Sequence, residues 1–144
     1  MSISLRRFGG RRLESGEIET LLEESKISRV CCHNEDGTIH ATPVWFRYEN
    51  GYIRMAIHRE SRKARNIKRN KNVTILIEEQ GRALGVIIYS TAMLDDVDVI
   101  DKAISINEKY QSKEDAKATI EKLFKETDYI LTVKTERMVS FNYS

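Results

Sequence analysis

Two glycine-containing turns, at residues 36–37 and 50–51, constrain the fold more than any other feature. Asp36-Gly37 and Asn50-Gly51 each separate runs that are rich in β-branched and aromatic residues, which is the pattern of a β-hairpin. The runs cover residues 27–33, 38–48 and 52–58. Three strands joined by two tight turns predict an antiparallel meander.

The rest of the chain alternates irregularly between strand-like and helical segments. The strand-like segments are short and rich in β-branched residues: residues 73–79, 85–94, 129–133 and 139–143. The helical segments have apolar residues at spacings of three and four: residues 17–24 (with Ser15 as the cap), 61–70, 97–110 and 113–124. This pattern predicts a mainly β protein, a small antiparallel barrel with peripheral helices, and argues against a parallel α/β sheet.

The length of 144 residues predicts one domain that spans residues 1–144. Residues 1–15 lack periodicity, so we expect a loose amino-terminal arm; it holds four arginines but no apolar stretch typical of a secretory signal. No apolar run approaches the roughly 20 residues of a membrane span. The adjacent Cys31 and Cys32 point to opposite faces of a strand and make no disulfide with each other. We therefore expect a reduced, cytoplasmic protein with no membrane partner.

A cationic segment, residues 59–71, dominates the distribution of charge. It holds seven basic residues and one acidic residue, a local charge of +6, whereas the rest of the chain carries −4. Ser61 is a good N-cap for a helix that starts at Arg62. The first turn of that helix then holds Arg62 and Lys63, although the helix dipole favours acidic residues there. A bound phosphate would satisfy both cations and the free N–H groups of the helix start.

Two other interpretations of this cationic segment stay open. It could be a solvated basic face without a ligand, or it could contact nucleic acid through phosphate groups. Nucleic acid is the less favoured partner, because the rest of the chain is acidic and the helix lacks interleaved aromatic residues for base stacking. The three histidines (His33, His40 and His58) lie on strand-like segments without metal-ligand spacing, so we expect no metal site.

The only proline of the chain, Pro43, lies inside a strand-like run, two residues before the only tryptophan, Trp45. Because proline cannot donate a ladder hydrogen bond, this stretch must lie at a sheet edge, at a bulge or at a split that faces a ligand. Two interpretations follow. Trp45 is a core aromatic residue at the barrel edge, or main-chain groups freed near Pro43 hydrogen-bond a flat polar ligand.

In this order, residues 27–95 resemble the flavin-binding split barrels related to pyridoxamine 5′-phosphate oxidase. The resemblance is carried by five stretches: Asp36-Gly37, Thr42-Pro43-Val44-Trp45-Phe46, Ser61-Arg62-Lys63-Ala64-Arg65-Asn66-Ile67, residues 73–79 and residues 86–92. It implies a six-stranded antiparallel Greek-key split β-barrel with peripheral helices. It also implies a homodimer with FMN in a groove between the subunits.

The resemblance also implies which residues bind the cofactor. Arg62 and Lys63 would hold the FMN phosphate, and Ser61 would begin that turn. The strand of residues 41–46 would meet the edge of the isoalloxazine ring mainly through main-chain groups, and Ala56 and Ile57 would lie near the ribityl chain and the phosphate. The expected cofactor-binding residues are therefore Thr42, Pro43, Val44, Trp45, Ala56, Ile57, Ser61, Arg62 and Lys63, with no catalytic side chain and no metal ligand.

By resemblance, the protein is an FMN-binding, flavin-dependent oxidoreductase that acts on an unidentified small molecule, with the flavin ring accepting the hydride. Oxidation of pyridoxamine 5′-phosphate itself is not expected, because Gly85 stands where the oxidases carry a glutamine from the second subunit. One alternative is a module that binds FMN, a deazaflavin or haem without turnover. Another is a nucleic-acid-binding barrel that uses the basic helix at residues 59–71. The dimer is expected to bury the strand surface of residues 86–91.

Overall fold

Both glycine turns form as predicted in the structure, a computed structural model that describes residues 2–4 and 11–143. The N–H of Gly37, with φ +88°, donates to the carbonyl of Asn34 at 3.1 Å. Asn50 and Gly51 have φ values of 52° and 80°, as a two-residue type I′ hairpin turn requires. The turns therefore reverse the chain where the sequence indicates.

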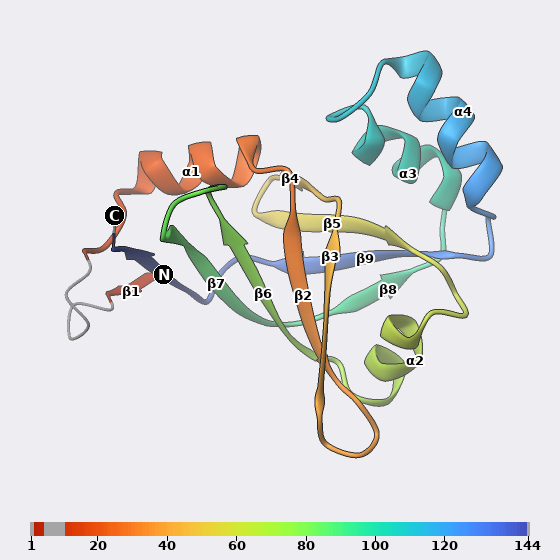
Figure 1. Ribbon diagram of the computed structural model, residues 1–144. Helices are drawn as coiled ribbons and strands as arrows, with labels where there is room; N and C mark the ends of the chain where they lie inside the picture. The colour runs from red at the N-terminus through yellow and green to blue at the C-terminus, as the bar shows by residue number, and fades with distance from the viewer. Residues whose placement is uncertain (1, 5–10, 144) are drawn as a thin grey trace.

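The strands form two sheets (Figure 1). The larger sheet has the order β1-β10-β7-β6-β2-β3 and the smaller has the order β4-β5-β9-β8. The β1–β10 pair is parallel, and the other pairs are antiparallel. In chain order the strands are β1 (Ser2–Ser4), β2 (Ser28–His33), β3 (Ile39–Val44), β4 (Arg47–Glu49), β5 (Tyr52–Ile57), β6 (Asn72–Glu78), β7 (Leu84–Thr91), β8 (Met93–Asp95), β9 (Tyr129–Lys134) and β10 (Met138–Asn142).

The helices lie at the periphery, as predicted (Figure 1). They are α1 (Ser15–Glu24), α2 (Arg62–Arg69), α3 (Val99–Asn107) and α4 (Lys113–Leu123). Helices α1 and α2 lie near opposite ends of β6, whereas α3 and α4 pack on each other and α3 contacts β5 and β9. The expectation of a mainly β protein with peripheral helices is confirmed.

Two of the predicted strands, residues 38–48 and 85–94, cross from one sheet to the other, at Trp45–Phe46 and at Ala92. At each place, one long predicted strand is divided into two: β3 pairs with β2 while β4 pairs with β5, and β7 and β8 likewise belong to different sheets. The predicted single meander is therefore wrong. Within residues 2–4 and 11–143 the structure has ten strands rather than six, and the two sheets do not close into one barrel.

The main core fills the space between the two sheets. Alternation in β5 sends Ile53, Met55 and Ile57 into this core, while Ala56 packs against a second, smaller cluster beneath α3 and α4. Phe46, at the first crossing, is completely buried in the main core. The crossing is therefore fixed in place by one large aromatic side chain.

The amino-terminal segment is more ordered than the predicted loose arm. Ser2–Ser4 pairs with β10, and Leu13 is buried, with its N–H donating to the hydroxyl of Ser140 at 3.0 Å. The edge of β10 offers this pairing, which no local sequence pattern can indicate. Residues 1 and 5–10 lie outside the described residues.

Candidate functional site

Helix α2 starts where the sequence predicts, with Ser61 as its N-cap. The Ser61 hydroxyl accepts a hydrogen bond from the N–H of Ala64 at 3.1 Å, and the Ser61 carbonyl accepts one from the N–H of Arg65, also at 3.1 Å. The N–H groups of Arg62 and Lys63 precede this first intrahelical bond, so the helix itself gives them no partner. The start of α2, which we call the cationic end, therefore carries two positive side chains and two backbone N–H groups that have no hydrogen-bond partner within the helix.

Lys63 reaches from α2 to the edge strand β3. Its Nζ donates to the hydroxyl oxygen of Thr42 at 2.5 Å. The side chain is half-buried, and this burial lowers the pKa of the ammonium group. In the part of the chain that the structure describes, no carboxylate lies within ion-pair distance of Lys63. A half-buried cation without an acidic partner is a position where a bound anion would be stabilised.

His40 belongs to the same positive region, although the sequence analysis assigned it no role in ligand binding. Burial lowers the pKa of its imidazole, and the charges of Lys63 and Arg62 lower it further. His40 and Thr42 lie on the same face of β3, because alternate residues of a strand share a face. That two-residue spacing is the sequence signal that could have placed His40 beside the predicted phosphate site.

The two sheets separate next to this cationic end. β3 is an edge strand, paired with β2 on one side, and Pro43 lies there as expected for a residue that cannot donate a ladder bond. β5 pairs with β4 only as far as Arg54, so Met55, Ala56 and Ile57 have no strand partner on that side in the described structure. Because Val44 pairs with Ser28 instead of continuing toward β5, a split opens between β3 and β5. Main-chain groups on the open edge of β3 and at residues 55–57 of β5 therefore have no strand partner in the described structure.

The side chains of Ala56 and Ile57 do not join this cationic end. Ile57 packs in the main core, and Ala56 packs against the α3–α4 cluster. Any contact that these residues make with a ligand must therefore come from their main-chain groups at the split.

At the crossing, the adjacent residues Trp45 and Phe46 have opposite environments, and this contradicts the interpretation of Trp45 as a core residue. Trp45 is 41% exposed, so its interpretation as a core residue is wrong, and Phe46, at 0%, occupies the core instead. The indole of Trp45 stacks on the ring of Tyr110, with centroids 4.2 Å apart and planes inclined by 8°. Val44 is half-buried, and its carbonyl accepts a hydrogen bond from the hydroxyl of Ser28 at 2.9 Å.

The turn between α3 and α4 holds the crossing through two side chains that sequence reasoning missed. The hydroxyl of Tyr110 accepts a hydrogen bond from the N–H of Phe46 at 2.9 Å and lies 2.8 Å from the carbonyl of Lys26. The ammonium group of Lys109 lies 2.5 Å from the carbonyl of Ser25 and 3.2 Å from that of Phe46. These contacts satisfy the N–H and the carbonyl of Phe46 at the crossing, and they also tie the crossing to the carbonyls of Ser25 and Lys26 before β2. No local motif at residues 109–110 could have indicated them.

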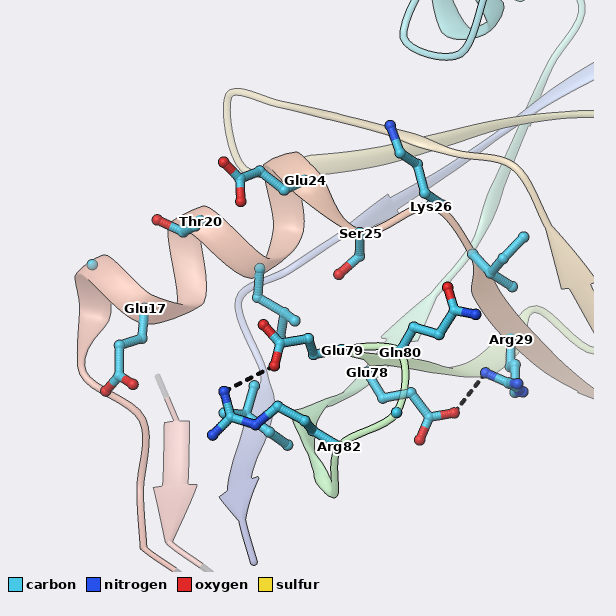
Figure 2. Close-up of a pocket in the computed structure, with 15 residues that line it drawn as sticks. Glu17, Thr20, Glu24, Ser25, Lys26, Arg29, Glu78, Glu79, Gln80 and Arg82 are labelled. Carbon is cyan, nitrogen blue, oxygen red and sulfur yellow. Dashed lines mark hydrogen bonds and ion pairs between the residues drawn. The ribbon is translucent and has the colours of Figure 1, made fainter. Parts of the chain in front are cut away.

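A groove of about 990 Å³ lies elsewhere, between α1, the start of β2 and the β6–β7 turn (Figure 2). Its charged side chains are largely paired with one another: Arg29 lies 2.6 Å from Glu78, and Arg82 lies 2.9 Å from Glu79. A second hollow of about 550 Å³ lies on the outer face of the larger sheet. Neither hollow is lined by Arg62 or Lys63.

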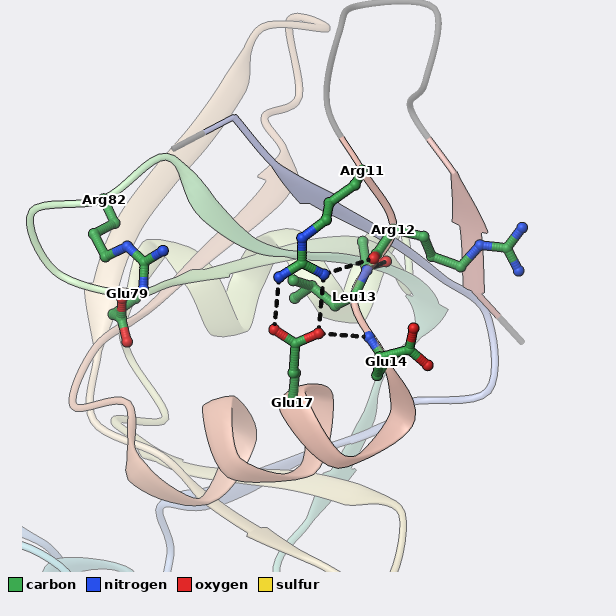
Figure 3. Close-up of polar contacts among 8 residues, drawn as sticks. Arg11, Arg12, Leu13, Glu14, Glu17, Glu79 and Arg82 are labelled. Atoms are coloured by element: carbon green, nitrogen blue, oxygen red, sulfur yellow. Dashed lines mark hydrogen bonds and ion pairs between the residues drawn. The ribbon is translucent and has the colours of Figure 1, made fainter.

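The start of α1 borders the larger groove and is tied to the amino-terminal segment (Figure 3). Arg11 makes two hydrogen bonds to the carboxylate of Glu17, at 3.0 and 2.9 Å, and Glu17 also accepts from the N–H of Glu14 at 3.0 Å. The hydrogen bond from Arg11 is the main reason that the pKa of Glu17 falls to about 2. The N-cap of α1 is therefore Glu14, and the expected cap, Ser15, is the first helical residue.

Two sheets that separate at an edge proline, beside a cationic helix start, define a split β-barrel. The sequence pattern of the family described as pyridoxamine 5′-phosphate oxidase matches residues 15–134, and the chain belongs to this family. No curated protein matches the chain significantly.

Three solved structures show the same fold at low sequence identity. A conserved hypothetical protein from Mycobacterium tuberculosis is 20% identical with a TM-score of 0.77, over 90% of this chain and 85% of that one. A structure named F420 reductase is 18% identical with a TM-score of 0.69, over 88% of this chain and 98% of that one. The haem storage protein HutZ from Vibrio cholerae is 16% identical with a TM-score of 0.70, over 88% of this chain and 94% of that one. In the described residues, no helix is both long enough and apolar enough to cross a bilayer.

Proposed function

We propose that this protein binds FMN in the split between β3 and β5 and uses it to oxidise or reduce a small molecule. The observation that carries the proposal is Lys63, a half-buried ammonium group with a hydroxyl partner but no acidic partner among the described residues. The terminal phosphate of FMN is a dianion that would fit Lys63, Arg62 and the free N–H groups at the start of α2. His40 adds a further donor on the same face of β3.

The residues present fit the rest of the cofactor through main-chain chemistry. The flavin ring is flat and has hydrogen-bonding groups along its edge, and the free edges of β3 and β5 offer unpaired N–H and C=O groups. Thr42 and Pro43 to Trp45 line one edge, while Ala56 and Ile57 line the other. When bound, the flavin supplies hydride transfer, and the protein binds it, orients it and limits its contact with water.

A homodimer completes this proposal, because the outer face of the larger sheet carries exposed apolar side chains. Ile39 is 56% exposed and Tyr89 is 37% exposed, on strands that share that face. Exposed apolar residues on a sheet favour burial against a partner. Within the strand expected at this interface, residues 86–91, Val86 and Ile88 point into the core, so only the residues that alternate with them can face a partner. Sedimentation at micromolar concentration should give a dimer, and Tyr89→Glu should shift it toward monomer.

Purified protein tests the cofactor directly. We expect a yellow protein with flavin absorption bands, which releases FMN on denaturation as identified by mass spectrometry. The names of two similar structures suggest haem and a deazaflavin as other cofactors. A haem Soret band or a released deazaflavin would show that the cofactor is not FMN, and the split would remain the proposed site. A colourless preparation that carries RNA would overturn the proposal in favour of nucleic-acid binding.

A further inference from the structure

An exposed aromatic pair stands at the crossing, immediately after the strand that borders the split. Trp45 and Tyr110 stack in nearly parallel planes, yet Trp45 remains 41% exposed. The hydroxyl of Tyr110 contacts the main chain of Phe46 and Lys26, and these contacts hold the Tyr110 ring in position under the indole. One face of the indole is covered by Tyr110, and its exposed area provides a flat surface for another ring.

Two lysines lie over the Tyr110 ring of this pair, and Arg47 adds a third positive charge that acts on one of them. The Nζ of Lys109 lies 5.2 Å and that of Lys26 lies 5.7 Å from the centroid of the Tyr110 ring. Arg47 donates to the carbonyl of Ser105 at 2.7 Å. Glu49, 3.6 Å from Arg47, is the acid that pairs with this group, and among the described residues neither lysine has a carboxylate within ion-pair distance.

The local excess of positive charge acts on the lysine at its centre. Burial is the main cause that lowers the pKa of Lys109 to about 8, and the charges of Lys26 and Arg47 lower it further. A purely structural role explains why Lys109 and Tyr110 contact the main chain of Phe46. That role uses neither the exposed area of the Trp45 indole nor the charge of Lys26 near the Tyr110 ring.

We propose that Trp45, Tyr110, Lys26 and Lys109 form a binding platform for a planar aromatic anion, such as an aromatic carboxylate. The ring stacks on the exposed indole, and the negative group lies toward the two lysines. This inference deepens the proposed function and rests on it in one respect: the platform directly follows β3, so a ring bound there would be the substrate that approaches the flavin.

The single tryptophan makes the test direct, because intrinsic tryptophan fluorescence reports on Trp45 alone. The protein as purified is titrated with 4-nitrobenzoate, followed by calorimetry and by quenching of that fluorescence. Two matched probes separate the contributions: 4-nitrobenzyl alcohol keeps the ring without the charge, and cyclohexanecarboxylate keeps the charge without the planar ring. We expect 4-nitrobenzoate to quench Trp45 and to bind at least about tenfold more tightly than either probe.

Substitutions then locate the site. Lys26→Gln, which removes an exposed charge without touching the core, should weaken 4-nitrobenzoate about tenfold and leave the alcohol unchanged. Lys117→Gln, on the exposed surface of α4, is the matched control and should change neither. Equal binding of the three probes, binding without quenching, or equal losses at Lys26 and Lys117 would overturn the platform.

The same variants separate this inference from the proposed function. FMN affinity should not change in Lys26→Gln, because the phosphate site lies at Lys63. If the protein fails to bind FMN but 4-nitrobenzoate still quenches Trp45 in a Lys26-dependent way, the FMN proposal falls and the platform stands. If FMN binds and 4-nitrobenzoate does not, the platform alone is wrong.

Discussion

Lys63 donates from its ammonium group to the hydroxyl of Thr42 at 2.5 Å, and this contact joins the start of α2 to the edge strand β3. The two residues lie on separate elements and were expected independently to contact one cofactor. Their contact places the cationic helix start at one end of the split between β3 and β5. The relationship therefore fixes where a phosphate and a ring would lie relative to one another.

The first prediction concerns this ammonium group. Lys63→Met keeps the apolar stem of the side chain but removes the charge. A charge-assisted phosphate contact contributes roughly 1.5–3 kcal/mol, so FMN affinity should fall about ten- to a hundredfold. Riboflavin, which lacks the phosphate, should bind almost as before. Fluorescence titration of both ligands measures the difference.

The control for this prediction is Lys71→Ala, an exposed lysine of the same cationic segment. Arg69 is unsuitable, because its guanidinium donates to the carbonyl of His33 at 2.7 Å and to the side chain of Asn66 at 3.2 Å. Lys71→Ala should change neither titration. Equal losses of FMN and riboflavin in Lys63→Met would place the phosphate elsewhere.

The second prediction compares the two aromatic residues at the crossing. Truncating a large buried aromatic residue costs about 3–5 kcal/mol, so Phe46→Ala should strongly lower the free energy of unfolding. Trp45→Ala should cost clearly less, because the indole is 41% exposed. Urea denaturation of both variants, followed by circular dichroism, ranks them. A larger loss for Trp45→Ala would mean that Trp45 is buried, as in a dimer interface.

These two residues also show where sequence reasoning reaches its limit. The turns at Gly37 and Gly51 and the cap at Ser61 depend on local backbone preferences, and each formed as predicted. Which of two adjacent aromatic residues is buried depends on where the strand leaves one sheet for the other. That choice is made by pairing partners distant in the sequence, so the sequence left open whether Trp45 lies in the core, and it did not indicate Phe46.

The candidate site divides in the same way. Lys63 and Thr42 were found through motifs whose order and spacing are visible in the sequence. Tyr110 and Lys109 contact the crossing only because the α3–α4 turn folds back onto it, more than sixty residues along the chain. Helical periodicity can predict those helices but not the surface on which their connecting turn docks.

The third prediction concerns Gly85 on β7, which stands where the related oxidases carry a glutamine. A Cβ at this position would lie 2.3 Å from the carbonyl oxygen of Ile77 and 2.9 Å from the Cα of Glu78. Both atoms are main chain, so they cannot move aside cheaply. Gly85→Ala should therefore destabilise the protein, as a lower thermal midpoint would show. An unchanged midpoint would mean that β6 and β7 are farther apart than in the structure.

A matched variant separates this steric effect from backbone strain. Gly81 has φ +79° in the turn between the same two strands, with open space around its Cα. Gly81→Ala adds strain of about 1 kcal/mol without a clash. We expect Gly85→Ala to lower the thermal midpoint further than Gly81→Ala. A Cβ at residue 85 would clash with the main chain, whereas a Cβ at residue 81 would meet only open space.

The last prediction concerns the pH dependence of the contact between Arg11 and Glu17. The pKa of Glu17 is about 2 in the folded protein, below its ordinary value of 4.5, mainly because of the hydrogen bond from Arg11. A carboxylate whose folded pKa is lowered stabilises the native state above its unfolded pKa. That contribution falls as the pH drops from about 4.5 toward 2. The free energy of unfolding should therefore differ most between wild type and Glu17→Gln near neutral pH, and the two should converge as the pH approaches 2.

Because the pair is exposed, the difference should also shrink in high salt. Glu23→Gln is the control, because Glu23 is an exposed glutamate on the same helix and makes no ion pair within the described residues. Denaturation curves of the three proteins at several pH values measure these differences. A constant gap between wild type and Glu17→Gln down to about pH 2.5, or an equal gap for Glu23→Gln, would show that the Arg11 contact does not stabilise α1.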